Sequence, residues 1–467
     1  MNSFMHWIDL TIIILFLGGF SVYGLWQSQY NQSTSDYFLG GRNLPWPISM
    51  LSIVATETSV LTFISIPGLA YRDDWFFLQL AIGYIIGRIL VSVFLLPQYF
   101  KSGVTSIYEV IGHKFGPEIQ KVASGIFLIT RILADGVRFL ATAVVVQVIT
   151  GWPLASAVLI IGAVTLVYTL FGGIRTVVWV DSIQFILYLF GGVASIIIVL
   201  NQLDQSIFEV LPTLSDQGKL SIFNWSGSLI KDPYYFLSAI IGGALLSFSS
   251  HGVDHMMVQR VLGTKDLNAA RKAMVGSGIF VFIQFGVFLL AGSLIYLLLG
   301  GIELERDREF TSFIVNYLPV GLKGVLLAGV LSAAMSTLSS SINSLASSTI
   351  TDWIGGEQSI RKSQFVSLIW GIILIGIALL FDESDSAIVI VGLQIASFTY
   401  GGLLGLFLLS KFNQQFHSAS ISLGLLFRLS TVFYLKQIGL AWTWFIGIAV
   451  IVQICMVFFI QKLLFRQ

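Results

Sequence analysis

The sequence predicts an all-α polytopic membrane protein. Hydrophobic residues make up 56% of its 467 residues, and charged residues only 10%, well below the roughly 25% of a typical soluble domain. The apolar stretches run for about twenty residues, the length that an α-helix needs to cross a bilayer, without the alternation of a β-barrel strand. A net charge of +1 offers no basic surface for nucleic acid. We therefore expect the lipid bilayer as a partner, and no nucleic acid.

Apolar stretches separated by charged or turn-rich breaks predict about thirteen membrane spans. The first has neither a basic segment before it nor a small-residue cleavage site after it, so we interpret it as a spanning helix rather than a signal peptide. Three spans, 119–150, 233–259 and 311–350, are long enough to tilt or to continue outside the lipid. In order, the expected spans are 7–27, 46–70, 75–100, 119–150, 153–171, 176–200, 233–259, 273–299, 311–350, 363–381, 386–409, 418–435 and 439–461.

The distribution of basic residues predicts the orientation of these spans. Most Lys and Arg residues fall in the breaks after odd-numbered spans and at the C-terminal end, whereas the even-numbered breaks collect acids such as Glu303, Asp307 and Asp382. The positive-inside rule therefore predicts an external N-terminus and a cytoplasmic C-terminus, as an odd number of spans requires. We expect a multi-pass protein of the cell membrane without an appended soluble domain.

The second and the seventh expected spans, which are five spans apart in order, both contain small and hydroxyl residues at mid-membrane. They are residues 55–59 (ATETS) in the second span and 247–251 (SFSSH) in the seventh. Because five is odd, two five-helix units that begin with these spans would have opposite orientations. Paired interrupted helices in inverted halves are typical of the midplane site of a secondary transporter, although small residues also serve ordinary helix packing.

Ionisable residues inside the spans are informative because each is costly in a membrane unless it is paired or hydrated. Glu57 lies among hydroxyl residues, where an unwound helix would offer oxygen ligands to an alkali cation. Its alternative role is structural, as the partner of an Arg from another helix. Arg131, Asp135 and Arg138 share one face of the fourth span. Asp135 would neutralise one Arg, and the other would pair with Glu57 or Asp181, or contact an anionic substrate.

Two further spans carry candidate functional residues. The seventh span closes with Asp254 and Arg260, for which we expect a gating ion pair or an anchor at the lipid interface. The ninth is rich in hydroxyl residues, and Ser336, Ser340 and Asn343 fall on one of its faces. Hydroxyl groups can bond their own helix, but their density here favours an oxygen-lined path for a cation.

Catalytic and nucleotide-binding motifs do not occur in the sequence. It has no Walker motif, no H-E-x-x-H motif and no plausible nucleophile–base pair. We therefore expect no enzyme activity, and transport driven by an ion gradient. Two alternatives are a membrane-embedded solute sensor, which normally carries a cytosolic signalling domain, and a non-coupled channel or facilitator, which needs a continuous pore.

Five stretches resemble a known family when they are taken in order. They are 36–42 (DYFLGGR), 51–71 (LSIVATETSVLTFISIPGLAY), 171–184 (FGGIRTVVWVDSIQ), 254–260 (DHMMVQR) and 331–352 (LSAAMSTLSSSINSLASSTITD). The chain is similar to the sodium/solute symporters, which include sodium-coupled carriers of glucose, proline, pantothenate, iodide, monocarboxylates and sialic acid. The resemblance covers nearly the whole chain and implies a LeuT-like fold with an inverted repeat. Its parts in the single transporter domain 1–467 would be a peripheral helix 7–27, five-helix repeats 46–200 and 233–409, and a peripheral pair 418–461.

The resemblance also implies an activity and its sites. The protein would be a sodium-coupled symporter that imports a small organic solute by alternating access, with sodium as the coupling ion. The main sodium site would use carbonyl groups of the second and ninth spans and two hydroxyl groups, from residues Ala55, Thr58, Ala333, Ser336 and Thr337. A second sodium site, found in only some members, would combine Asp181 with the hydroxyl groups of Ser336, Thr337, Ser339 and Ser340.

The solute site implied by the resemblance lies between spans 2, 3, 4, 7 and 11. Its candidate residues are Glu57, Ser59, Thr62, Phe77, Gln79, Phe248 and Gln394. The position of Glu57 resembles an Asp of the proline-carrier branch, so this carboxylate is a candidate contact of sodium, of the solute or of an Arg in the fourth span. The run ATETS differs from the pattern expected of sugar carriers, and a sugar substrate is therefore not favoured.

Overall fold

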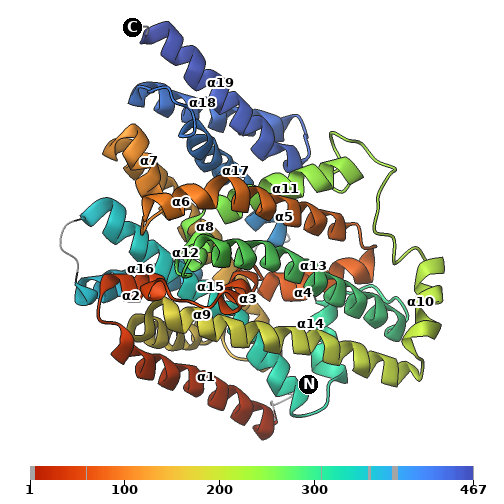
Figure 1. The fold of residues 1–467 in the computed structure, drawn as a ribbon. Helices are drawn as coiled ribbons and strands as arrows, with labels where there is room; N and C mark the ends of the chain where they lie inside the picture. The colour runs from red at the N-terminus through yellow and green to blue at the C-terminus, as the bar shows by residue number, and fades with distance from the viewer. Residues whose placement is uncertain (1–5, 59, 307, 356–358, 381–387, 466–467) are drawn as a thin grey trace.

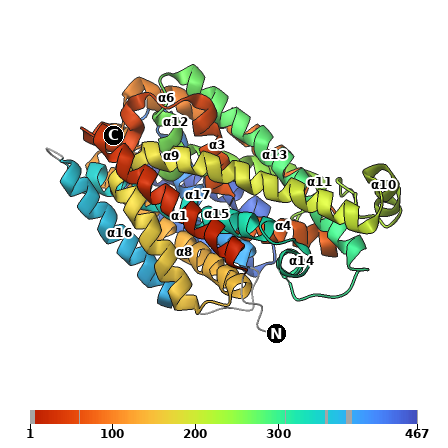
Figure 2. The same cartoon turned by 90° about the horizontal axis from the view of Figure 1, so that it is seen from below.

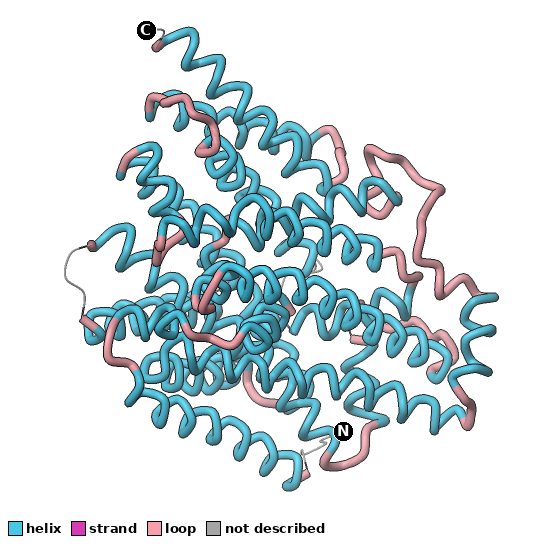
Figure 3. The backbone as a smooth tube through the Cα atoms, in the orientation of Figure 1, coloured by secondary structure: helices cyan, strands magenta, loops and turns pink. Residues whose placement is uncertain are grey.

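The protein is built from helices, as predicted. The computed structural model describes residues 6–58, 60–306, 308–355, 359–380 and 388–465, without the side chains of some helical residues such as 388–398. Within these ranges every regular element is a helix, and Figure 3 shows the helices joined mostly by short loops. The all-α prediction is confirmed for the described part of the chain.

The first half of the chain contains the longest helical element. The two predicted spans 153–171 and 176–200 correspond to α9 (Leu154–Leu203), which consists of two helices joined across a kink at Gly173, where φ is 60° and ψ is −165°. A Cβ at Gly173 would lie 2.8 Å from the carbonyl oxygen of Tyr37, so both the backbone angle and the close approach require glycine. The other helices of this half are α1 (Trp7–Gln27), η1 (Ser28–Tyr30), α2 (Thr34–Leu39), η2 (Gly40–Arg42), α3 (Trp46–Glu57), α4 (Val60–Arg72), α5 (Phe77–Leu90), η3 (Val91–Leu95), α6 (Leu96–Ser102), α7 (Tyr108–Phe115), α8 (Pro117–Thr150) and α10 (Ile207–Asp216).

The second half of the chain contains the most deeply buried helix, α15 (Leu322–Ser348). Its most apolar stretch is 94% buried, and it runs through the middle of the bundle in both views (Figures 1 and 2). The hydroxyl residues of the predicted ninth span therefore face protein rather than lipid. The other helices of this half are α11 (Phe236–Gly252), α12 (His255–Leu262), α13 (Leu267–Leu298), α14 (Glu309–Tyr317), η4 (Thr349–Ile354), α16 (Ile360–Leu380), α17 (Ile388–Leu409), α18 (Ser418–Gln437), η5 (Trp442–Trp444) and α19 (Phe445–Leu464).

Two pairs of helices are bent spans rather than continuous ones. The axes of α3 and α4 differ by 64°, and those of α11 and α12 by 63°. They lie in the second and seventh predicted spans, where the sequence has small and hydroxyl residues at mid-membrane. Helices broken at membrane depth are tolerated where the freed backbone groups are buried in protein or line a cavity.

Glycine residues bring α5 and α11 into close contact. A Cβ on Gly83 would overlap backbone atoms of Ile240 and Ala244, and a Cβ on Gly243 would overlap the carbonyl oxygen of Leu80. Small residues at such contacts let two membrane helices approach closely. The contact fixes α5 alongside α11.

The structure supports many membrane spans, and it gives their number only as a range. Eight helices of the described chain are long and apolar enough to cross a membrane, or up to ten if each bent pair is one span. The long helix α9 enters this count once, although it covers two predicted spans. In Figure 1 the helix α1 lies at one edge of the bundle, and α18 and α19 lie at the opposite edge.

Candidate functional site

The break between α3 and α4 lies inside the bundle. The last backbone hydrogen bond of α3 runs from the amide of Thr58 to the carbonyl of Val54, at 2.9 Å, and Thr58 then leaves the helical conformation with φ −83° and ψ 91°. The final carbonyl groups of a helix lack intrahelical partners. Because Ala55 and Thr58 are only 5% and 3% exposed, this helix end lies inside the protein.

A small cavity lies beside this helix end. Its volume of about 10 Å³ is roughly the space of one water molecule or a small ion. The lining residues come from α3, α9 and α15, with Thr58 from the break, and are Ala55, Thr58, Gln184, Phe185, Tyr188, Ala333 and Ser336. Four of the five residues expected at the main sodium site are therefore brought together. The fifth, Thr337, donates a hydrogen bond to the carbonyl of Ala333 at 3.1 Å.

Two side chains of this cavity have unused polar atoms. The hydroxyl oxygen of Ser336 is buried without a hydrogen-bond partner in the described part of the protein, and so are both amide atoms of Gln184, which is 2% exposed. Buried polar atoms without partners are uncommon in proteins and call for a ligand or water. Sequence reasoning missed Gln184 as a site residue, although it is the last residue of the family-like stretch 171–184.

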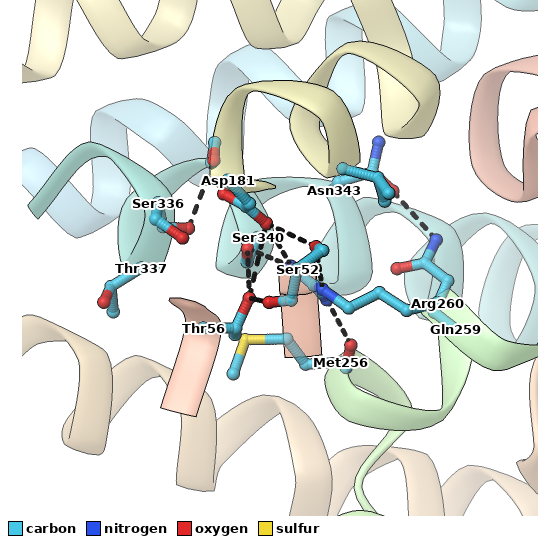
Figure 4. Close-up of polar contacts among 12 residues, drawn as sticks. Ser52, Thr56, Asp181, Met256, Gln259, Arg260, Ser336, Thr337, Ser340 and Asn343 are labelled. Carbon is cyan, nitrogen blue, oxygen red and sulfur yellow. Dashed lines mark hydrogen bonds and ion pairs between the residues drawn. The ribbon is translucent and has the colours of Figure 1, made fainter. Parts of the chain in front are cut away.

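Asp181 lies next to this cavity in a buried polar network (Figure 4). Its Oδ2 atom accepts a hydrogen bond from Ser52 at 2.7 Å and pairs with the guanidinium of Arg260 at 3.2 Å. Arg260 also donates to Ser340 and, at 2.8 Å, to Ser52. Thr56 closes the ring through Asp181 and Ser340, at 3.4 Å and 3.3 Å.

The partner of Asp181 is therefore not the one expected. The sequence offered Arg131 or Arg138, but Arg260 reaches Asp181 because α12, beyond the bend in the seventh span, packs against α3 and α15. The second carboxylate oxygen, Oδ1, has no hydrogen-bond partner in the described ranges, and Ser336 lies close to this carboxylate.

The remaining hydroxyl groups of the expected second site are placed differently. Ser340 belongs to the network of Asp181. Ser339 donates instead to the carbonyl of Ser336, at 3.1 Å, and Thr337 lies apart from Asp181 in Figure 4.

A second charge cluster joins α8 to the break between α11 and α12. Asp135 contacts both Arg131 and Arg138, at 3.3 Å and 3.5 Å, while Arg131 also pairs with Asp254 at 3.0 Å. The hydroxyl of Tyr400 completes the cluster by donating to Asp254 at 2.6 Å and accepting from Arg131. The surplus arginine of α8 is thus neutralised by Asp254, and not by Glu57 or Asp181.

Asp254 and Arg260 do not form the expected pair with each other. Both are fully buried, so an anchor at the lipid interface is also excluded. Asp254 begins α12, accepts a hydrogen bond from the amide of Met256 at 3.0 Å and points to α8. Arg260 lies nearly two turns later and points to α9, because residues six apart face different sides of a helix.

Glu57 has an arginine partner, but from a different helix than expected. Its Oε2 atom pairs with Arg88 of α5 and lies 3.6 Å from Nε2 of His251, at the end of α11. Arg88 is fully buried and also donates to Ser277 at 2.6 Å, whereas the Glu57 side chain is 18% exposed. The glutamate therefore has a structural partner and still reaches accessible space.

The other candidate solute residues are only partly brought together. Phe77 and Phe248 are 8% and 7% exposed and lie on α5 and α11. All polar atoms of the Gln79 side chain are hydrogen-bonded to backbone groups. Its amide nitrogen donates to the carbonyls of Phe76 and Tyr234, and its amide oxygen accepts from the backbone amide of Asn224, at 3.0 to 3.2 Å. Thr62 is half-buried on α4. Ser59 lies outside the described residues, as does the side chain of Gln394.

A lysine from the loop that follows α10 holds the end of α4. The ammonium of Lys219 donates to the carbonyls of Tyr71 and Arg72, at 2.7 Å and 3.0 Å, and lies 4.1 Å from the ring centre of Tyr296. Burial lowers the pKa of Lys219 from its ordinary value. Arg72 itself pairs with Glu309 of α14. These contacts fix the C-terminal end of α4.

Comparison with known proteins identifies this architecture. A family model described as the sodium:solute symporter family matches residues 37–424. The sodium/sialic acid symporter NanT of Aliivibrio fischeri is 24% identical over 445 residues, which cover 91% of this chain and 87% of that protein. The sodium-coupled monocarboxylate transporter 1 of Mus musculus is 27% identical, over 87% of this chain and 69% of that protein.

Solved structures share the fold. A Na⁺-coupled sialic acid symporter in a substrate-bound outward-open state superimposes with a TM-score of 0.87 at 23% identity, over 98% of both chains. Mhp1, a nucleobase-cation-symport-1 family transporter, superimposes with a TM-score of 0.58 at 14% identity, over 92% of this chain and 96% of that one. The family match covers most of the chain. The chain therefore belongs to the sodium:solute symporter family, and it is a multi-pass membrane protein that couples the movement of a small solute to sodium.

Proposed function

We propose that this protein imports a small organic solute into the cytoplasm with sodium bound in the cavity between α3, α9 and α15. The sodium ligands would be the carbonyls of Ala55, Thr58 and Ala333 and the hydroxyl of Ser336, and the unpartnered amide oxygen of Gln184 would add one more. Thr337 would join them by turning its hydroxyl away from the carbonyl of Ala333.

The observation that carries this proposal is the buried, unpartnered hydroxyl of Ser336 in an ion-sized cavity beside a helix end. Carbonyl and hydroxyl oxygens are hard ligands suited to an alkali cation. A sodium ion there would link the break after α3 to α15. It would therefore favour the conformation in which both helices are in contact, and solute binding to that conformation would be coupled to sodium. At about −100 mV, each inward charge would contribute roughly 2.3 kcal/mol to accumulation.

The Asp181 network would provide a second sodium site in the same proposal. The buried charges of the two clusters and of the Glu57–Arg88 pair balance, because four arginines face four carboxylates. Oδ1 of Asp181 and the hydroxyl of Ser336 both lack a geometric hydrogen-bond partner among the described residues, and Ser336 lies close to the Asp181 carboxylate. A second cation would use both, with Ser340 as a further oxygen ligand.

We further propose the orientation and repeat expected from the sequence, with thirteen spans, an external N-terminus and a cytoplasmic C-terminus. The two similarly bent helix pairs, α3/α4 and α11/α12, support the inverted repeat of 46–200 and 233–409. The change of direction of α9 at Gly173 supports two spans within that one helix. Cysteine residues placed singly in 201–232 and 411–417, and labelled from one side of intact cells, would test this topology.

Sodium binding to Ser336 is tested with a matched pair of variants on α15. Ser336→Ala should weaken the binding of radioactive sodium to the purified protein by about tenfold, or roughly 1.4 kcal/mol. Ser332→Ala is the control, because that hydroxyl donates to the carbonyl of Ala328 in its own helix, at 2.5 Å, and should leave sodium affinity unchanged. Unchanged sodium affinity in Ser336→Ala would remove the assignment of this site.

A further inference from the structure

The last part of the chain carries an excess of positive charge. Residues 386–467 contain five Lys and Arg residues and no Asp or Glu, although the whole protein has a net charge of only +1. This part includes α17, α18 and α19, and the last two of these helices lie at one edge of the bundle (Figure 1). No acid of the same region can therefore neutralise its basic side chains.

A groove lies where this pair of helices ends. Its volume is about 1030 Å³, and it is formed by residues 414–417, which lead into α18, and by the C-terminal part of α19. This volume is comparable with that of the larger ligand pockets of proteins. Four phenylalanines, three glutamines, a leucine, His417 and Lys462 line the groove. None of these described lining residues is acidic, so the groove offers positive charge and hydrogen-bond donors beside aromatic rings.

His417 is held in a fixed position at the edge of the groove. Its ring stacks on Phe465, with the ring centres 4.0 Å apart and the planes at 9°. Its Nδ1 atom accepts a hydrogen bond from the amide of Ala419, at the start of α18, at 3.3 Å. The neutral imidazole therefore carries its proton on Nε2, which can donate to a ligand.

Two neighbouring side chains of α19 add further donors. The amide oxygen of Gln461 accepts from the backbone amide of His417 at 2.8 Å and from the hydroxyl of Ser420 at 3.0 Å. This orients the amide nitrogen of Gln461 as a donor, because oxygen and nitrogen lie on opposite sides of a side-chain amide. The ammonium of Lys462 is exposed and has neither a hydrogen bond nor an ion pair with the residues that the structure describes.

The same end of α19 also presents carbon surface to the outside. Phe459, Leu463 and Leu464 are 59%, 65% and 60% exposed, and α19 belongs to a segment long and apolar enough to cross a membrane. These side chains therefore contact lipid in the membrane. The long side chain of a lysine at a helix end can keep its charged group at the membrane surface.

We propose that this groove binds an anionic phospholipid, whose phosphate accepts hydrogen bonds from Lys462, from Nε2 of His417 and from the amide nitrogen of Gln461. Basic pockets beside membrane helices bind acidic lipid headgroups. The ammonium group of a zwitterionic lipid would be repelled by Lys462 and would find no acid in the described lining. The site is separate from the sodium cavity, which lies between α3, α9 and α15.

A free phosphate would use the same donors but not the carbon surface beside them. The exposed side chains of α19 therefore favour a lipid, with its acyl chains on Phe459 and Leu463 and its headgroup in the groove. With the proposed orientation, the lipid would belong to the cytoplasmic leaflet.

Competition between ligands tests the inference on the purified full-length protein. Native mass spectrometry in an uncharged detergent measures the binding of phosphatidylglycerol, of phosphatidylcholine with the same acyl chains, and of glycerol 1-phosphate. Phosphatidylglycerol should bind at least about tenfold more tightly than each of the other two. Equal affinities for the two lipids, or equal affinities for phosphatidylglycerol and glycerol 1-phosphate, would overturn the inference.

Variants then assign the binding to the groove. Lys462→Gln should weaken phosphatidylglycerol binding about fivefold, or roughly 1 kcal/mol, the contribution of one basic residue near an acidic lipid surface. His417→Asn retains a side chain that can cap the start of α18 but removes the Nε2 donor, so the double variant K462Q/H417N should bind more weakly still.

The control is Lys362→Gln, which removes an exposed lysine at the start of α16, on another part of the bundle (Figure 1). It should retain the affinity for phosphatidylglycerol, and all variants should bind phosphatidylcholine as the wild type does, which shows that they are folded. Unchanged phosphatidylglycerol affinity in K462Q/H417N, or an equal loss in Lys362→Gln, would contradict the assignment to this groove.

Discussion

The buried pair of Asp181 and Arg260 makes a sharp prediction about stability. Asp181→Asn preserves the shape of the side chain and its acceptor for Ser52, but removes the negative charge 3.2 Å from the guanidinium. Both side chains are fully buried, so Arg260 would keep its charge without compensation. Breaking one partner of a buried ion pair costs about 3–5 kcal/mol. We expect the free energy of unfolding to fall by this amount.

The assay is equilibrium unfolding of purified protein in mixed micelles, followed by circular dichroism. Asp216→Asn is the control, because this acid is exposed at the end of α10 and its loss should change stability by less than about 0.5 kcal/mol. The double variant D181N/R260M removes both charges, and it should be more stable than Asp181→Asn because no charge is left unpaired. The reasoning would be refuted if the free energy of unfolding of Asp181→Asn lay within about 1 kcal/mol of the wild-type value, or if the double variant were no more stable than the single variant.

Three other predictions concern transport and the cavity. If Asp181 binds a second sodium ion, reversal potentials should give two sodium ions per solute for the wild type and about one for Asp181→Asn. A ratio of one sodium ion per solute in the wild type would exclude this site. Gln184→Leu should lower sodium affinity in a binding assay, whereas Gln202→Leu, at the exposed end of the same helix, should not; equal affinities would remove Gln184 from the sodium ligands. Lys219→Met should release the carbonyls of Tyr71 and Arg72 at the end of α4 and increase hydrogen exchange there, and unchanged exchange would show that Lys219 does not hold this end.

The membrane architecture could be predicted because the bilayer imposes it on the sequence. A span needs a long apolar stretch, and helices of the structure follow these stretches closely, as α13 (Leu267–Leu298) does for the predicted 273–299. The interruption of the second span could also be predicted, since ATETS places polar side chains at membrane depth. The break between the predicted spans 153–171 and 176–200 could be predicted as well, but its geometry, two helices joined directly at Gly173 with φ 60°, is a local backbone conformation that glycine allows.

The pairing of charges could not be predicted from spacing within one helix. Glu57 pairs with Arg88 and Asp181 with Arg260, and both partners belong to other helices whose rotation and depth follow from packing. The one pairing that sequence spacing did predict, Asp135 with Arg131 and Arg138, lies within one helix, over about two turns of α8. Gln184 gave no signal because a glutamine in an apolar helix normally serves packing or a hydrogen bond; only its lack of partners in the structure marks it.

The location of sodium tests the central claim most directly. Density maps of the protein prepared in sodium and in potassium should differ by a peak in the cavity bounded by Ala55, Thr58, Ala333 and Ser336, whether or not a second peak lies beside Asp181, and Ser336→Ala should abolish the peak in the cavity. An empty cavity in both maps, with a sodium-dependent peak beside Glu57 instead, would contradict the account.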